Sequence, residues 1–85
     1  MSWRYQPVYV EHKVDDESIK EFSLCEVYLD EKGLLEMWTE NHEIAPHGND
    51  IEDLIGAIEL MLNDAQRWKA VSFKSLRVGM KLEGV

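Results

Sequence analysis

The hydrophobic positions of this chain change period once, within residues 44–50. Before that segment apolar residues recur at every second position, which is the spacing of half-buried strands. After it they recur at every third or fourth position up to Trp68, which is the spacing of an amphipathic helix. The change of period therefore predicts a sheet followed by one packed helix.

Three strands are expected, over residues 3–12, 21–30 and 34–40. Asp30 can open a tight turn and Gly33 can adopt positive φ, so the last two strands should form a hairpin. The expected register places Leu29 opposite Leu35, Val27 opposite Met37, and Cys25 opposite Thr39. Residues 13–20 are mostly polar and acidic, and we expect them to form an exposed, mobile connection without chemistry.

The helix should begin after Asp50, whose carboxylate can cap the first turn, with Asn49 as a competing cap. Its apolar side chains fall within an arc of about 120° and are expected to cover one sheet face. They are Ile51, Leu54, Ile55, Ile58, Met61, Leu62 and Ala65. The predicted fold class is α+β: a three-stranded antiparallel β-meander (β-β-β-α), one long amphipathic helix on one face, and a short C-terminal extended segment or tail.

Length and charge distinguish an acidic domain from a basic C-terminal segment. The 85 residues suit a single domain, expected over residues 1–73, with a partly disordered basic tail over residues 74–85. Residues 1–66 carry four Lys/Arg against sixteen Asp/Glu, a net charge of −12, whereas residues 67–85 carry five against one, a net of +4. The acidic body argues against nucleic-acid binding. The basic tail either contacts an acidic partner or balances the helix end and the acidic body.

Cys25 is the only cysteine, so one chain can form neither a disulfide nor a cysteine-based zinc site. The first residues show no apolar signal core, and charges interrupt every apolar run before it reaches the length of a membrane span. We expect a cytoplasmic protein without a membrane role.

Candidate chemistry is sparse. His42 and His47 share a loop with Glu43 and Asp50, and an ion would bind there if the protein were a histidine-based metal-binding protein or enzyme. Cys25 should be buried and inert, and acidic residues already occupy the helix start that might otherwise hold phosphate. We expect no catalytic residue, no resident metal and no cofactor.

The sheet face opposite the helix is the more informative candidate. It is expected to gather aromatic and acidic side chains: Tyr5, Tyr9, Tyr28 and Trp38, interleaved with Glu26 and Glu36. This face suits a protein partner or a second copy of the chain, unless the segment containing Val71, Phe73 and Leu76 covers it. Leu60, near Gly56 on the outer side of the helix, is a second candidate contact.

Four motifs carry a resemblance to a family of small uncharacterised bacterial proteins. They are Met1-Ser2-Trp3 with Tyr5, Glu26-Val27-Tyr28 before Asp30-Glu31 and Gly33, Trp38-Thr39-Glu40, and Pro46-x-Gly48. That family implies no reaction. Residues 48–53 also resemble the helix start of HicB-like antitoxin domains, which implies an inhibitor of a small basic ribonuclease. The residues favour a non-catalytic protein-interaction module or a homodimer, and the HicB-like antitoxin is the alternative.

Overall fold

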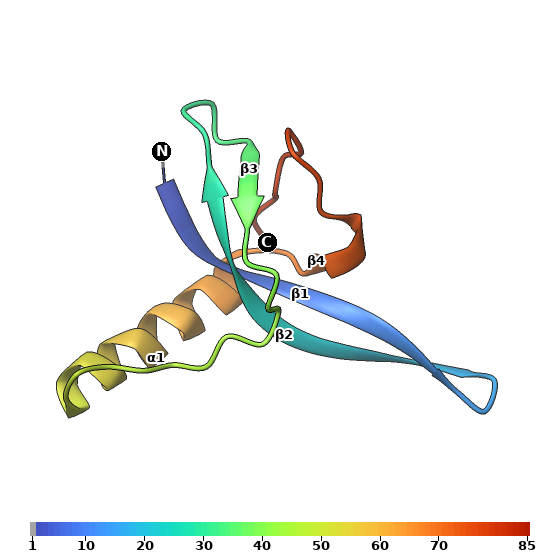
Figure 1. The fold of residues 1–85 in the computed structure, drawn as a ribbon, viewed down its shortest axis with the longest axis horizontal. Coiled ribbons are helices and arrows are strands. Elements are labelled where there is room, and N and C mark those ends of the chain that lie inside the picture. The colour runs from blue at the N-terminus through green and yellow to red at the C-terminus, as the bar shows by residue number, and fades with distance from the viewer. Residues whose placement is uncertain (1) are drawn as a thin grey trace.

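The computed structural model describes residues 2–85 and contains a four-stranded sheet and one long helix (Figure 1). The elements are β1 (Ser2–Val14), β2 (Glu17–Leu29), β3 (Leu35–Trp38), α1 (Ile51–Arg67), β4 (Val71–Ser72) and a 3₁₀ turn, η1 (Phe73–Ser75). The strand order is β3-β2-β1-β4. β1 pairs with β2, and β2 with β3, in antiparallel fashion, whereas β4 runs parallel to β1. The α+β class is confirmed, with a fourth strand and a mixed sheet in place of the three-stranded meander.

β1 and β2 form one long hairpin that extends into the segment expected to be a mobile connection. Residues 13–20 belong to its two strands and to a two-residue turn, where Asp15 and Asp16 have φ of +49° and +69°. Two consecutive positive φ values match the right-handed twist of the strands. Glu11 lies opposite Lys20, and His12 Nε2 is 3.2 Å from Glu21 Oε2. The segment is exposed as expected, but it continues the two paired strands and does not form a separate loop.

The β2–β3 hairpin closes through the turn that the sequence predicts. Asp30 Oδ1 accepts hydrogen bonds from the backbone N–H groups of Lys32 and Leu34, and Gly33 has a φ of +80°. Leu29 pairs with Leu35 as expected, but the register then shifts so that Tyr28 pairs with Met37 and Val27 with Trp38. The extra β3 residue is Glu36. The other two expected pairings are therefore wrong.

The core lies on the sheet face that carries Cys25 and Val27, and the C-terminal segment covers it. Its buried apolar side chains are Val8, Cys25, Val27, Leu29, Leu35, Leu76 and Leu82, with Trp38, Val71, Phe73 and Met80 packed around them. Residues 74–85, expected to be a partly disordered basic tail, pack on this face through Leu76 and Leu82. Two backbone hydrogen bonds fix them to β3, from the Leu35 N–H to the Met80 carbonyl and from the Gly79 N–H to the Leu35 carbonyl.

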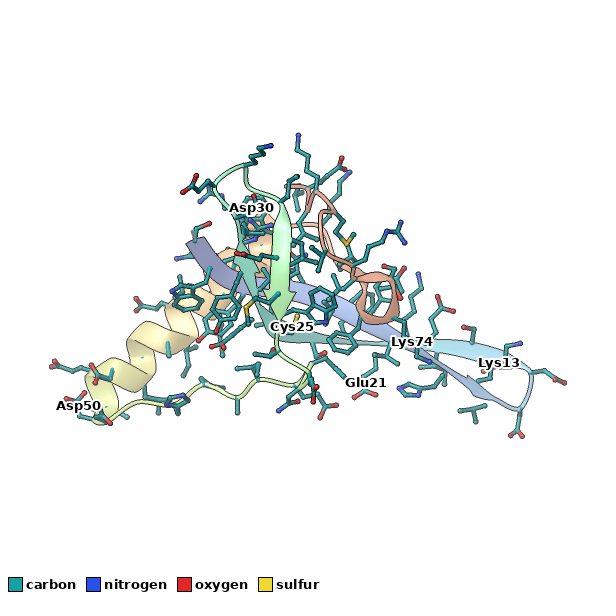
Figure 2. All side chains as sticks on the ribbon, turned by 45° about the horizontal axis from the view of Figure 1, so that its top comes forward. Lys13, Glu21, Cys25, Asp30, Asp50 and Lys74 are labelled. Carbon is teal, nitrogen blue, oxygen red and sulfur yellow. The ribbon has the colours of Figure 1, made fainter. Side chains whose placement is uncertain are left out.

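Asp50 caps α1 as predicted, because its Oδ1 accepts from the Asp53 N–H at 2.8 Å. The helix projects away from the sheet, with Asp50 at one tip of the molecule and the hairpin turn near Lys13 at another (Figure 2). Met61 and Asp64 are its only buried residues. The expectation that its apolar stripe covers the sheet is wrong, since the C-terminal segment occupies the apolar face.

Candidate functional site

The sheet face opposite the core carries a patch of aromatic and acidic side chains next to the end of α1. Trp3 lies directly across from Tyr28, and Tyr5 directly across from Glu26, on β1 and β2. Residues directly opposite one another share a face, so these four side chains adjoin. Met37 pairs with Tyr28 from β3 and extends the group. We call Trp3, Tyr5, Glu26, Tyr28 and Met37 the Trp3–Tyr28 patch.

Contacts within the Trp3–Tyr28 patch hold its side chains in place. The Trp3 and Tyr5 rings meet edge to face, with centroids 5.5 Å apart. Tyr28 donates a hydrogen bond of 3.2 Å from its hydroxyl to Glu26 Oε2. Trp3 and Met37 are about half exposed, whereas Tyr5 is buried. The patch therefore presents ordered apolar surface around one carboxylate, and little side-chain freedom remains to be lost on binding.

Charge and burial keep the two tyrosines of the patch protonated. The negative charge of Glu26 is the main cause that raises the pKa of Tyr28, and the hydrogen bond between them adds to it. Burial is the main cause that raises the pKa of Tyr5, followed by the charges of Glu26 and Asp64. Both hydroxyls are thus hydrogen-bond donors at neutral pH, because the ordinary pKa of tyrosine is already about 10.

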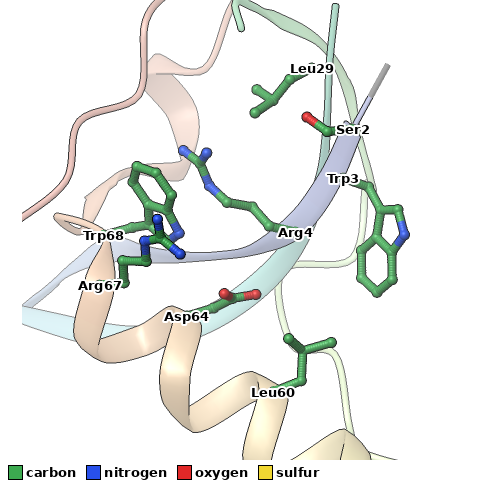
Figure 3. A pocket seen from close by; sticks show the side chains of 8 residues that line it. All are labelled: Ser2, Trp3, Arg4, Leu29, Leu60, Asp64, Arg67 and Trp68. Atoms are coloured by element: carbon green, nitrogen blue, oxygen red, sulfur yellow. The ribbon is translucent and has the colours of Figure 1, made fainter.

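A hollow of about 440 Å³ adjoins the patch between the start of β1 and the end of α1 (Figure 3). Its lining combines two guanidinium groups, two indoles and one carboxylate: Ser2, Trp3, Arg4, Leu29, Leu60, Asp64, Arg67 and Trp68. The Arg4 guanidinium carbon lies 3.4 Å from the Trp68 ring centroid, and that of Arg67 lies 5.3 Å from it. The negative face of the indole attracts both guanidinium groups.

Arg4, Gln6 and Asp64 join the first strand to the helix. Asp64 Oδ2 accepts from the Tyr5 N–H at 3.0 Å, and the fully buried Gln6 donates from Nε2 to the Pro7 and Lys69 carbonyls. Arg4 Nη2 donates to Gln6 Oε1 at 3.3 Å. Burial lowers the pKa of Arg4, and nearby Asp64 opposes that change. An arginine nevertheless stays charged. The hydrogen bonds of Gln6 and Asp64 connect β1 to α1 and to the residues just after it, so they help to fix the direction of the helix.

The structure brings together only part of the residue set predicted for this face. Tyr5, Glu26 and Tyr28 are in contact range, and Leu60 lines the adjoining hollow. Tyr9 lies further along β1, where its ring is 5.7 Å from Phe22. The shift in register at Glu36 places Trp38 on the core face, among the side chains under the C-terminal segment.

Sequence reasoning omitted Trp3 and Met37 from this site. Trp3 has the same strand parity as Tyr5, so the alternation of β1 was a sufficient signal for it. Met37 gave no such signal, because it reaches this face only through the extra residue in β3. Arg4, Asp64 and Trp68 meet through the orientation of the helix, which residue spacing does not encode.

The other candidate chemistries are spatially separated. His42 Nδ1 lies 3.2 Å from Ser23 Oγ, its ring is 4.9 Å from that of Phe73, and His47 is exposed further along the loop. Among residues 2–85, no three His, Cys, Asp or Glu side chains are grouped as a metal ion requires. Cys25 is fully buried, and burial is the main cause that raises its pKa to about 11. Its thiol is therefore a poor nucleophile at neutral pH.

The comparisons with known proteins identify no relative. No family model, no curated protein and no solved structure matches this chain. Within the part of the chain that the structure describes, no helix combines the length and apolar character that crossing a membrane requires.

Proposed function

We propose that this protein is a non-catalytic protein-interaction module that binds its partner through the Trp3–Tyr28 patch. The observation that supports the proposal is the pairing of Trp3 with Tyr28 and of Tyr5 with Glu26 on a sheet face that the C-terminal segment leaves open. Large, ordered aromatic side chains contribute much of the binding energy in protein interfaces. A partly exposed tryptophan and methionine beside them extend the apolar area available to a partner.

The partner's chemistry follows from the charges around the patch. Glu26 lies within it, Glu36 is exposed on neighbouring β3, and residues 1–66 carry a net charge of −12. A partner surface with apolar side chains and a basic rim complements this arrangement. Electrostatic attraction of that kind raises the association rate and weakens as salt is added.

The acidic charge also favours one particular form of this proposal, an antitoxin-type inhibitor of a small basic ribonuclease. In that form the ribonuclease would occupy the Trp3–Tyr28 patch, and the excess acidic charge would attract it. The test is inhibition of a basic ribonuclease encoded beside this protein. Undiminished cleavage of RNA at saturating protein would remove this form and leave the general module in place.

Quantitative affinity capture with single substitutions tests the module. Trp3→Ala and Tyr28→Ala should each weaken binding of a captured basic protein by about tenfold or more, as for residues at the centre of an interface. Val14→Ala is the matched control, because Val14 is an exposed apolar residue at the outer end of β1, beside the hairpin turn and away from the patch. Circular dichroism verifies that all three variants fold. Equal affinities for wild type, Trp3→Ala and Tyr28→Ala would contradict the proposal.

A further inference from the structure

α1 carries a second apolar surface that the rest of the domain leaves about half exposed or more. Four of its side chains are between 47% and 67% exposed: Ile51, Ile55, Ile58 and Leu62. At 100° per residue they span an arc of about 60° along one side of the helix. We call them the Ile51–Leu62 stripe. Met61 and Asp64, which contact the body of the domain, lie on a different side of the helix.

The total accessible surface of the chain is larger than that of a typical monomer of its mass. The chain exposes 6211 Å², whereas folded monomers of its 9.9 kDa mass expose about 5,200 Å². The excess of about 1,000 Å² exceeds the roughly 800 Å² that each partner loses in a standard stable interface. The long hairpin and the projecting α1 account for the elongated shape (Figure 1). Of the two, α1 presents the continuous apolar stripe.

From the spacing of this stripe we infer that the occupant is a second copy of the chain, packed helix against helix about a two-fold axis. The intervals between its four residues are 4, 3 and 4, so the stripe reads the same in both directions. In an antiparallel pair, Ile51 of one copy then meets Leu62 of the other, while Ile55 meets Ile58. An isologous interface requires this reciprocity. The inference goes beyond the proposed function and uses different side chains.

A hollow at the end of the stripe fits the same arrangement. Ala65 follows Leu62 and borders a space of about 430 Å³ that is lined mostly by apolar residues, among them Pro7, Phe22 and Leu24. In the antiparallel pair, the first turn of the second helix passes beside Leu62 and Ala65 and reaches the mouth of this hollow. Phe22, which is also exposed, then gains an apolar neighbour. Both ends of the stripe are thereby covered.

The acidic residues beside the stripe give the dimer a distinctive electrostatic signature. Glu52 and Glu59 follow the stripe on one side, about 80° from its centre at 100° per residue. The two-fold axis keeps this side common to both copies, so Glu52 of one lies near Glu59 of the other. The negative charges of these two neighbouring glutamates repel each other and oppose association of the two copies. Added salt and the substitution Glu59→Gln should therefore strengthen the dimer, whereas both would weaken binding of a basic protein at the stripe.

Sedimentation equilibrium of the full chain tests the inference. The wild type should sediment with twice the chain mass of 9.9 kDa, and Ile55→Asp should weaken association by at least about tenfold because the change enters the interface twice. Leu60→Asp is the matched control, since Leu60 is 41% exposed on the opposite side of the same helix. It should remain dimeric. A monomeric wild type at every attainable concentration, or equal effects of the two aspartates, overturns the inference.

Disulfide trapping tests the antiparallel register. A mixture of Ile51→Cys and Leu62→Cys chains should form the mixed disulfide on oxidation, while neither variant alone should cross-link efficiently. The native Cys25 does not compete, because it is fully buried. Efficient cross-linking of Ile51→Cys with itself would indicate parallel helices and would overturn the two-fold arrangement.

Discussion

The Asp64 carboxylate on α1 accepts a hydrogen bond of 3.0 Å from the backbone N–H of Tyr5, fifty-nine positions earlier in the chain. Asp64 is one of two buried residues in a helix that otherwise projects into solvent. The bond satisfies a backbone donor of β1 and determines where the helix leaves the sheet. It therefore sets the position of the Ile51–Leu62 stripe relative to the Trp3–Tyr28 patch.

Replacement of Asp64 should lower stability more than replacement of any exposed acid on α1. Asp64→Ala leaves the Tyr5 N–H without its charged acceptor, a loss of about 1.5–3 kcal/mol. Glu59→Ala should change the free energy of unfolding by less than about 0.5 kcal/mol. Urea unfolding of both variants measures the difference. Similar midpoints would show that the Asp64 bond contributes little.

Two glycines should respond in opposite directions to the same substitution. A Cβ at Gly48 would clash with the backbone nitrogen of Leu54, whereas a Cβ at Gly56 would enter open space. Gly48→Ala should cost about 2 kcal/mol because the loop must move off the first turn of the helix. Gly56→Ala should stabilise by about 0.5–1 kcal/mol through helix propensity. Thermal unfolding followed by circular dichroism tests both, and a destabilised Gly56→Ala would contradict the open surface at that position.

The C-terminal segment should contribute strongly to stability through Leu82. Leu82→Ala removes a buried side chain from the core and should cost about 2–4 kcal/mol. Val78→Ala, on the exposed side of the same segment, should change stability by less than about 0.5 kcal/mol. Chemical denaturation distinguishes the two. A tolerated Leu82→Ala would instead favour a partly disordered tail.

Stability should decline at alkaline pH. Cys25 has a pKa raised from 9.0 to about 11 in the folded chain, so an unfolded chain loses this proton at lower pH than the folded one. Its contribution is constant below about pH 9 and diminishes as pH rises toward 11, by about 1–2 kcal/mol. The raised pKa values of Tyr5 and Tyr28 act in the same direction. Urea titrations at successive pH values should show a shallower decline for Cys25→Ala, and identical slopes would exclude Cys25 as a cause.

Local chemistry allowed several features to be predicted correctly from the sequence. Asp50 caps the helix because its own carboxylate accepts from the first turn. Gly33 adopts positive φ because it has no side chain to oppose that conformation. The long hairpin was missed for the opposite reason. Both faces of its outer end are in solvent, so residues 13–20 show no apolar alternation, and their turn uses two aspartates in place of the more common glycine or asparagine.

The sequence alone could not predict which apolar side chains are buried, because a periodic apolar stripe does not show which other segment packs against it. Ile58 belongs to an amphipathic arc, yet it is exposed, while Leu76 and Leu82 belong to no regular pattern and are buried. Both α1 and the C-terminal segment carry apolar side chains that could cover the same sheet face. The C-terminal segment occupies it, with backbone hydrogen bonds to Leu35. The position of Trp38 depended on one extra residue in β3.

The order in which the core is completed has a consequence for synthesis. Val8 and Val27 emerge early from the ribosome, but Leu76 and Leu82, which cover them, emerge only after the whole of α1 has been made. The apolar face of the hairpin therefore stays without its native cover until Leu76 and Leu82 are available, and incompletely folded chains with exposed apolar surface are prone to aggregate. Molecular chaperones that bind exposed apolar strands should accordingly associate with this chain until Leu82 has left the exit tunnel.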